Sequence, residues 1–416
     1  MAAFAHLEAR SASPTAGSAL ARFTTEWIAN EERFALLAPE WQQLARQINC
    51  GNAFTSFPWV STWWKHWGGG AQLAVITVRD QQQRLVGAAP FYVSQSGLRR
   101  LGFIADQNAG SDYLDILAAP GFDREVAAEV AHTLLTHRQH WDYIELSDTG
   151  DSPALRHFIS LLVEQDLHVQ QERASVCPYI DLPGTFEAYT ATLSGQYRRD
   201  VNRRWRMLQR EHGATFETHS TPREIREYFP ELCRLHALRF ASLERESAFL
   251  DPSVSTFHAD SALALAESGV ARMHLLRIRG QVVAALLGFS ANQQYQYFQM
   301  GFDPAWNHAG LGKVLLARTI EYAILTGHNR FDFLRGGEAY KSSWTSTVSA
   351  TYVWRAFDRR PSALLARGFF AARSAAGDAK HYLNGGSNHS ASLTRRYQYQ
   401  THSVPEQIGF GGPNKN

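Results

Sequence analysis

One continuous stretch of this chain, residues 295–344, constrains the possible fold more than any other. It reads YQYFQMGFDPAWNHAGLGKVLLARTIEYAILTGHNRFDFLRGGEAYKSSW. A strand-like apolar run leads through a glycine-containing turn into an amphipathic helix, and a second apolar run leads into a polar turn. The sequence therefore predicts a strand–helix–strand unit inside an α/β fold, with the helix beginning after Gly310 and Gly312.

The composition narrows the class of protein. A chain of 416 residues with 44% hydrophobic and 19% charged residues is long enough for two globular domains. Its net charge of +2 gives no overall electrostatic reason to expect nucleic acid or membrane partners. Cys50, Cys177 and Cys233 fit no disulfide framework or metal spacing, and no segment resembles a secretory signal or a membrane span. We expect a cytoplasmic protein without a metal site.

Two halves with a similar order of elements follow one another. WDYIEL at residues 141–146 and FDFLRG at 331–336 each follow an amphipathic helix, which indicates a duplicated αβ unit. The expected first-half elements are helices at 35–47, from about Pro58, at 124–137 and at 153–164, with strands at 73–78, 85–93, 113–117 and 143–146. The expected second-half elements are helices at 223–242, 256–266 and 311–326, with strands at 272–277, 282–289, 295–300, 330–334 and 352–357. We expect a mobile tail at 1–22, domains at 23–175 and 176–360, and a loosely held tail at 361–416.

The glycine turn before the helix at 311–326 is a candidate anion site. Glycines let backbone amides approach phosphate oxygens, and the following helix adds its dipole and free amides. Glycines also begin helices as simple packing or turn devices. The matching first-half helix opens with the charged residues 123–125 (Asp-Arg-Glu), so we expect that half to form a substrate wall rather than a phosphate site. The residues expected to hold a pyrophosphate are Asn307, Gly310, Leu311, Gly312 and Lys313.

The same turn resembles a known family. Its spacing is similar to the [Q/R]-x-x-G-x-[G/A] acyl-CoA loop of the GNAT acetyltransferase superfamily, with Asn307 where that family usually has Gln or Arg. GFDPAW, AGLGKVLL and FDFLRGGEAYKSSW, together with FTSFPWVSTWW, SDYLDIL and LHALRF, resemble the CelD-like acetyltransferase domain associated with cellulose and exopolysaccharide synthesis. That branch is related to the Fem-type peptidyltransferases, which have two GNAT-like halves. The resemblance covers roughly residues 50–357 and implies tandem GNAT-like domains, each a mixed twisted sheet flanked by helices, with acetyl-CoA or another acyl-CoA as co-substrate.

The turn after the strand at 330–334 carries the candidate catalytic residues. A phenol can protonate a leaving thiolate, and a carboxylate can accept a proton from an attacking amine. An ammonium can stabilise the oxyanion of an acyl-transfer reaction. We therefore expect Tyr340 to be the general acid, Lys341 the oxyanion stabiliser and Glu338 a base, and the resemblance places a tyrosine acid at this point. The alternative is a surface turn with Tyr340 and Trp344 packed inward.

An arginine-rich helix, SGQYRRDVNRRWRMLQREHG at residues 194–213, is a candidate polyanion-binding surface. Arg199, Arg203, Arg206 and Arg210 are spaced i, i+4, i+7 and i+11, so they share one face. Four like charges on one stripe fit a nucleotide-sugar, a lipid pyrophosphate, tRNA or the phosphates of CoA. The alternative is a solvated helix face.

Four further residues are candidate site residues. His236 and Arg239 lie one helical turn apart in LCRLHALRF, where His236 is either a second candidate base or a structural histidine. Asp112 and Asp115 in SDYLDIL either bind hydroxyls or amines of a substrate or face solvent on alternate sides of a strand.

These observations predict an acyl-CoA-dependent N- or O-acyltransferase that acts on a small or saccharide-type acceptor in polysaccharide or cell-envelope biosynthesis. One alternative is a Fem-type transferase that uses aminoacyl-tRNA, and only then would nucleic acid be a partner. The other alternative is a non-catalytic component of a polysaccharide synthesis complex that retains the fold.

Overall fold

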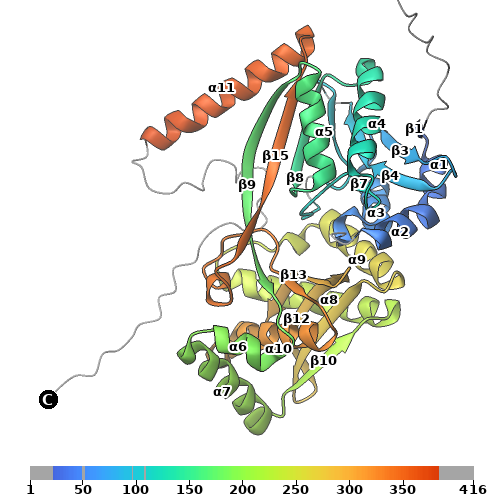
Figure 1. Cartoon of the computed structure of the whole chain (residues 1–416). Helices are drawn as coiled ribbons and strands as arrows, with labels where there is room; N and C mark the ends of the chain where they lie inside the picture. The colour runs from blue at the N-terminus through green and yellow to red at the C-terminus, as the bar shows by residue number, and fades with distance from the viewer. Residues whose placement is uncertain (1–21, 49–51, 96, 107–108, 384–416) are drawn as a thin grey trace, which may run out of the picture.

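The computed structural model in Figure 1 describes residues 22–383, apart from 49–51, 96 and 107–108. Cys50 and nearly all of the expected N-terminal tail therefore lie outside the described residues, as does the expected C-terminal tail beyond residue 383. The described chain is mixed α/β, with a small and a large sheet flanked by helices. The small sheet has the order β1 (Thr24–Ile28), β3 (Val75–Arg79), β4 (Leu85–Ala89) and β7 (Leu117–Ala118).

The large sheet runs through both halves of the molecule. Its order is β10 (Thr215–His219), β11 (Ala271–Ile278), β12 (Gln281–Ala291), β13 (Gln294–Phe302), β14 (Arg330–Asp332), β9 (His168–Asp181), β15 (Val348–Phe357), β8 (Tyr143–Thr149), β6 (Arg100–Phe103), β5 (Phe91–Ser94) and β2 (Ala71–Leu73). Most neighbours are antiparallel, but β13 pairs with β14 in parallel and β6 pairs with β8 in parallel. The sheet is therefore mixed in both halves.

Two long strands join the halves. In Figure 1, β9 and β15 run side by side from the upper to the lower part of the molecule. β15 pairs along its length with β9 and also pairs with β8 of the first half, whereas β9 reaches β14 of the second half. The domain boundary expected between residues 175 and 176 lies inside β9, where Ser175 pairs with Thr351. The halves are therefore connected by continuous strands rather than by a linker at that point.

Helices cover the sheets on their outer faces. Those of the first half are α1 (Glu31–Leu36), α2 (Ala38–Gln47), α3 (Phe57–Trp67), α4 (Asp123–Thr136) and α5 (Pro153–Glu164). Those of the second half are α6 (Phe186–Thr192), α7 (Gly195–His212), α8 (Pro222–Ala241), α9 (Pro252–Glu267) and α10 (Leu311–Leu325), and α11 (Pro361–Leu383) follows β15. Local signals set several of these bounds: Thr221 and Glu224 form a capping box at α8, and Pro58 lies in the first turn of α3.

The first-half helix α3 packs against the second half. The ring of Trp59 lies 5.2 Å from that of Phe257 on α9 and 5.8 Å from that of Phe289 on β12, both edge-on. Trp59 is 1% exposed, and its indole N–H donates to Ser111 Oγ at 2.8 Å. Aromatic burial of this kind contributes about 1.5–3 kcal/mol per side chain. The aromatic run that the sequence shows near Pro58 is thus part of a core shared by the two halves.

Several expected elements differ from the structure. The strand expected at 73–78 is divided at Ala74 into β2 of the large sheet and β3 of the small sheet. The strand expected at 85–93 is divided at Pro90 into β4 and β5. The strand expected at 113–117 is reduced to β7 and an isolated bridge between Leu114 and Thr149, because Tyr113 adopts a left-handed conformation with φ of 57°. The tail expected from residue 361 begins with the helix α11, in which Ala363 and Ala366 are buried.

Candidate functional site

The candidate site begins at an unpaired strand edge. β13 and β14 pair in parallel at three positions only, from Gln294↔Arg330 to Gln296↔Asp332. β14 ends there, while β13 continues to Phe302. Within the described residues, no strand therefore pairs with this side of β13 between Tyr297 and Phe302. Backbone groups along an edge need other partners, so this edge is a place where an extended ligand can bind.

The far end of this edge leads to the start of α10. Gly310 caps the helix in the left-handed conformation, with φ of 68°, which favours glycine, and a Cβ there would lie 3.0 Å from Arg204 Nη1 and crowd that side chain. The first intrahelical bond shown is from Val314 N–H to the carbonyl of Gly310, which leaves the amides of residues 311–313 to other partners. Gly312 packs against the strand, because a Cβ there would lie 3.1 Å from Phe302 Cε1. The free amides therefore lie beside the end of β13.

The expected pyrophosphate residues have different structural roles. Asn307 is exposed in the short helix η4 (Pro304–Ala309), and its carbonyl accepts from Gly310 N–H at 3.1 Å. Leu311 is 1% exposed and packs in the core of the second half, so only its amide is available to a ligand. Lys313 is partly exposed, and its ammonium lies 4.4 Å from the centroid of the Tyr197 ring. Of the expected side chains, Lys313 is therefore the one best placed to bind phosphate.

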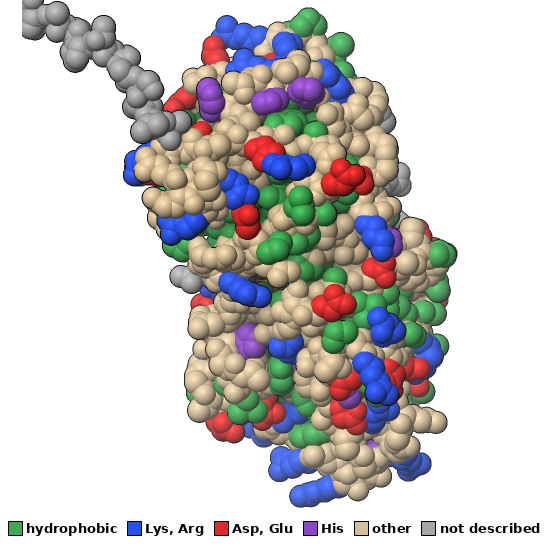
Figure 2. All heavy atoms as spheres, turned by 90° about the vertical axis from the view of Figure 1, so that its right-hand side faces the viewer, with side chains coloured by type: hydrophobic (Ala, Val, Ile, Leu, Met, Phe, Trp, Pro, Cys, Tyr) green, Lys and Arg blue, Asp and Glu red, His purple; other side chains and the backbone are tan. Residues whose placement is uncertain are grey.

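The arginine helix α7 lies beside this helix start. A hollow of about 530 Å³ is lined by Ser194, Gln196, Tyr197, Arg199, Asp200, Arg203 and Lys313. Arg199 and Arg203 thus face the start of α10, whereas Arg206 and Arg210 are exposed elsewhere on the same helix. Figure 2 shows basic side chains gathered at the lower end of the molecule, where Figure 1 places α7. The expected stripe is therefore divided between a hollow and open solvent.

Asp200 is the counter-ion of this cluster. Its carboxylate lies 2.9 Å from Lys313 Nζ, 2.9 Å from Arg203 Nη2 and 2.8 Å from Arg204 Nε. Burial raises its pKa, but hydrogen bonds from Arg204, Lys313 and Arg203 outweigh burial and hold that pKa well below its usual range. Arg204 also donates to the carbonyl of His308 at 2.8 Å and so fixes the glycine turn. The sequence pattern indicated neither Asp200 nor Arg204, because each interacts across two helices.

Tyr340 lies at the near end of the unpaired edge. It is half-buried, and its hydroxyl donates to the hydroxyl of Tyr297 on β13 at 3.3 Å. Burial, followed by the nearby Tyr297 and Glu338, raises the pKa of Tyr340 well above its ordinary value, so the phenol carries its proton at neutral pH. Trp344 is buried and packs edge-on against Tyr197. Tyr340 is therefore a proton donor beside the edge, and Trp344 supports the turn.

Lys341 is not placed as expected. Its side chain is 3% exposed, and its ammonium donates to the carbonyl of Arg335 at 2.9 Å and to those of Leu334 and Gly336 at longer distances. It also pairs with Glu338 at 2.9 Å. All of these partners belong to its own turn, so the assignment of Lys341 as an oxyanion stabiliser is corrected to a residue that holds the turn. Glu338 is the carboxylate partner of Lys341 in this ion pair.

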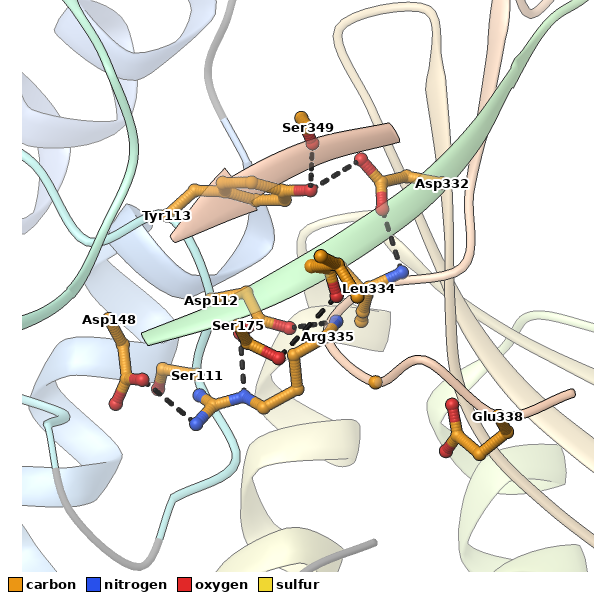
Figure 3. A network of polar contacts seen from close by, with 12 residues as sticks. Ser111, Asp112, Tyr113, Asp148, Ser175, Asp332, Leu334, Arg335, Glu338 and Ser349 are labelled. Carbon is orange, nitrogen blue, oxygen red and sulfur yellow. Dashed lines mark hydrogen bonds and ion pairs between the residues drawn. The ribbon is translucent and has the colours of Figure 1, made fainter. Parts of the chain in front are cut away.

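The same turn is anchored to the first half of the chain, as Figure 3 shows. Arg335 lies between two carboxylates: its Nε is 2.6 Å from Asp112 Oδ1 and its Nη1 is 2.9 Å from Asp148 Oδ1. Its backbone N–H also donates to Asp112 at 2.9 Å. Asp112 is 1% exposed, so it is neither a solvent-facing residue nor free to bind a substrate. Its sequence-based assignment as a substrate ligand is therefore corrected to an anchor of the turn that carries Tyr340.

A second link lies beside the first. Tyr113 donates its hydroxyl proton to Asp332 at 3.0 Å and contacts Ser349 Oγ at 3.0 Å, and Asp332 accepts from Leu334 N–H at 2.7 Å. Tyr113, Asp148 and Leu334 all have φ near +57°, a conformation that costs about 1–2 kcal/mol for non-glycine residues. Burial raises the pKa of Asp332 to about 7 and that of Asp148 to about 6. The first half thus fixes the turn at the cost of local strain.

His236 is a core residue of α8 rather than a base. It is 2% exposed, its Nδ1 lies 2.7 Å from Ser247 Oγ, and its ring stacks on Phe240. Burial, assisted by Arg239, lowers its pKa to about 3, so it is neutral at physiological pH. Gly301 allows this close packing, because a Cβ there would lie 2.2 Å from the His236 backbone nitrogen. The assignment of His236 as a candidate base is therefore corrected.

Arg239 and Asp115 lie in different environments. Arg239 donates to the carbonyl of Met300 at 3.0 Å and lies over the ring of Phe302, so it reaches the unpaired edge of β13. Asp115 accepts from Ser152 Oγ and from the Ile116 amide, both at 2.7 Å. Burial raises the pKa of Asp115 to about 7. Arg239 remains a candidate for binding a ligand. Asp115 instead bonds to neighbouring groups within the first half of the chain.

The described part of the chain has neither a cluster of metal-binding side chains nor a helix that could span a membrane. No group of three or more histidine, cysteine or carboxylate side chains could hold a metal ion there. In the same residues, every helix falls short of the length and apolarity that crossing a membrane requires.

Comparisons with known proteins show what the chain is similar to. Residues 195–342 match the model of the acetyltransferase (GNAT) domain. FemX is similar in structure with a TM-score of 0.55 and 11% identity, over 80% of this chain and 96% of that one. The C-terminal domain of a protein assigned as a lysylphosphatidylglycerol synthetase from Agrobacterium fabrum has a TM-score of 0.50 and 11% identity, over 80% and 95%. No curated protein matches in sequence. At such identities the structural matches establish the fold alone: the chain has a FemX-like fold, and its residues 195–342 are similar to the GNAT acetyltransferase domain.

Proposed function

We propose that this chain is an acyl-CoA-dependent N- or O-acyltransferase that acts on a small or saccharide-type acceptor. The observation that carries this proposal is the unpaired edge of β13, which has the free amides of α10 at one end and the Tyr340 phenol at the other. Acyl-CoA carries both a pyrophosphate, which free amides can bind, and a thioester, whose leaving sulfur needs a proton donor. The CelD-like motifs in the sequence favour a role in polysaccharide or cell-envelope biosynthesis.

The residues around the start of α10 fit the phosphates of CoA. The amides of residues 311–313 point out of the first turn, where the helix dipole favours an anion. Lys313, Arg199 and Arg203 add three cations around the same hollow. Gly310 and Gly312 let the start of the helix lie close to Arg204 and Phe302. We therefore assign the pyrophosphate to residues 310–313 and the remaining phosphate charge to the two arginines.

Acyl-CoA supplies an activated thioester carbonyl that an acceptor amine or hydroxyl can attack. We assign to Tyr340 the proton that the leaving sulfur takes up, because its phenol is protonated at neutral pH and lies beside the strand edge. The Lys341–Glu338 pair and Arg335 hold the backbone that carries Tyr340. Backbone amides along β13 would position the acyl arm, and Arg239 closes one side at Met300.

The direct test is acyl transfer by the purified chain. Acetyl-CoA and longer acyl-CoAs are incubated with a panel of amino sugars and hydroxylated sugars, and thiol release is measured together with the mass of the product. We expect thiol release that depends on both the chain and an acceptor, and that is lost in Tyr340→Phe. Absence of thiol release with every acyl-CoA, in a chain that is folded by circular dichroism, would sink the proposal.

One alternative has an observation in its favour. The FemX-like fold and the two outward arginines, Arg206 and Arg210, would suit a transferase that takes its acyl group from aminoacyl-tRNA. The same panel then includes aminoacyl-tRNA, with a gel-shift assay for tRNA binding. A shift that requires Arg206 and Arg210, without binding of acyl-CoA, would favour the alternative. A chain that binds neither donor would instead be the non-catalytic component.

A further inference from the structure

α11 is the helix that has apolar residues on two opposite faces. On one face Ala363 and Ala366 are buried, and Phe370 packs against Tyr143 and Phe357. On the other face Leu364, Leu365 and Phe369 are 51%, 68% and 58% exposed. Every other helix in the described residues exposes at most one large hydrophobic side chain. A group of three on one helix indicates a surface that binds something.

The position of α11 leaves this second face open. Figure 1 shows the helix leaving the end of β15 and running away from the body of the molecule, so that its far end is clear of both sheets. The exposed stripe begins in the first turns, where the opposite face is still packed on β8 and β15. The helix is thus fixed at its base and presents its outer face to the surroundings.

Basic residues outnumber acidic residues in this segment. Arg367 and Arg373 are exposed on α11, and neither forms an ion pair within the described part of the chain. In sequence, residues 359–383 contain the basic residues Arg359, Arg360, Arg367, Arg373 and Lys380 and the single acidic residue Asp378. With five basic residues and one acidic residue, this segment has a net charge of +4, compared with +2 for the whole chain. At about 100° per residue, Arg367 falls beside Leu364 and Arg373 beside Phe369, so the two arginines flank the large apolar side chains of the outer face.

This combination fits an anionic lipid surface better than a second copy of the chain. Apolar side chains that insert between headgroups and arginines that contact lipid phosphates are the two features of helices that lie in a membrane interface. A twofold contact between two copies would place the same face on both sides. Arg367 and Arg373 of each copy would then approach those of the other without a carboxylate from that described face. Like-charge repulsion thus disfavours self-association.

We propose that α11 is a docking helix that holds this protein on the surface of a membrane containing anionic phospholipids, through Leu364, Leu365 and Phe369 with Arg367 and Arg373. The helix lies in the interface and does not cross the bilayer. The inference is independent of the acyltransferase proposal, because it rests on α11 alone. It would bring the site near acceptors carried by lipids.

Vesicle sedimentation with the full-length chain tests the proposal. Vesicles of phosphatidylcholine with about one-third phosphatidylglycerol are compared with vesicles of phosphatidylcholine alone. The variant is Leu365→Glu/Phe369→Glu, and the matched control is Leu36→Glu/Leu325→Glu, since Leu36 and Leu325 are 72% and 79% exposed on other helices. We expect binding to the anionic vesicles only, weakened by added salt, about tenfold weaker in the variant and unchanged in the control.

Two further measurements keep the outcome decisive. Arg367→Gln/Arg373→Gln removes exposed charges without touching the buried face, so it folds as the wild type and should also weaken binding. Sedimentation velocity reports the oligomeric state. Equal binding to both vesicle types, equal loss in the variant and the control, or a wild-type dimer that Leu365→Glu/Phe369→Glu converts to a monomer would each overturn the proposal.

Discussion

The ammonium of Lys313 lies 2.9 Å from the carboxylate of Asp200, so α7 places its own anion beside the first turn of α10. An incoming phosphate must compete with this carboxylate for Lys313 and Arg203. We predict that Asp200→Asn tightens the binding of acetyl-CoA about fivefold and destabilises the fold by about 1 kcal/mol, since the pairs are partly exposed. Calorimetric titration and thermal unfolding measure the two effects. Asp181→Asn, which removes an exposed ion pair with Arg330, is the control and should leave binding unchanged.

Tyr340→Phe tests the assigned general acid. The substitution removes one hydroxyl and keeps the ring, so we expect kcat to fall by about a hundredfold or more while the dissociation constant of acetyl-CoA changes little. Tyr297→Phe is the matched control, because Tyr297 accepts the hydrogen bond from Tyr340 and is not assigned the proton transfer. Its kcat should fall by about tenfold at most. Equal losses in the two variants would contradict the assignment.

Arg335→Gln tests the anchor of the turn that carries Tyr340. It leaves Asp112 and Asp148 buried without their cation, so we expect a loss of about 3–5 kcal/mol in the free energy of unfolding. Arg330→Gln is the matched control, because Arg330 pairs with Asp181 at the surface. It should lower the free energy of unfolding by less than about 1 kcal/mol. Urea unfolding of both variants measures the difference. If both cost the same small amount, Arg335 does not anchor the turn.

Asp332 gives the fold a pH dependence. Its pKa is raised from its ordinary value to about 7, mainly by burial, so the folded chain holds a proton that the unfolded chain releases at lower pH. The free energy of unfolding should therefore fall as the pH rises through this window, by roughly 2 kcal/mol for this group between about pH 5 and pH 8. Asp332→Asn should flatten the decline, although Asp115 and Asp148 shift in the same direction and leave part of it. Urea unfolding at both pH values is the measurement, and an unchanged slope would contradict the account.

Local pattern was enough to predict the elements around the donor site. The glycine turn, the helix after Gly310 and the amphipathic α7 follow from residue type and spacing, which depend on neighbouring residues in the sequence. The glycines of this turn could also have been packing residues, and Gly312 does pack against Phe302. Sequence could therefore indicate a candidate site without separating residues placed to bind a ligand from those that pack.

The contacts between the halves could not be predicted in this way. The pairing of β15 with β8, and of Arg335 with Asp112 and Asp148, joins residues that are about two hundred positions apart. The spacing of apolar and polar residues within one helix or strand carries no information about such a contact. The structure corrects Lys341 and His236 for the same reason. The residue type alone does not tell whether a lysine or histidine side chain faces a ligand or is buried against the protein's own groups.

The central claim is that an acyl-CoA binds at the start of α10. The most direct measurement is calorimetric titration of acetyl-CoA into the wild type, into Arg199→Glu/Arg203→Glu and into Arg206→Glu/Arg210→Glu. All four arginines lie on α7, but only the first pair lines the hollow beside Lys313. We predict binding to the wild type, at least about tenfold weaker binding to the first variant and nearly unchanged binding to the second. Absence of binding to the wild type, or equal weakening in both variants, would contradict the account.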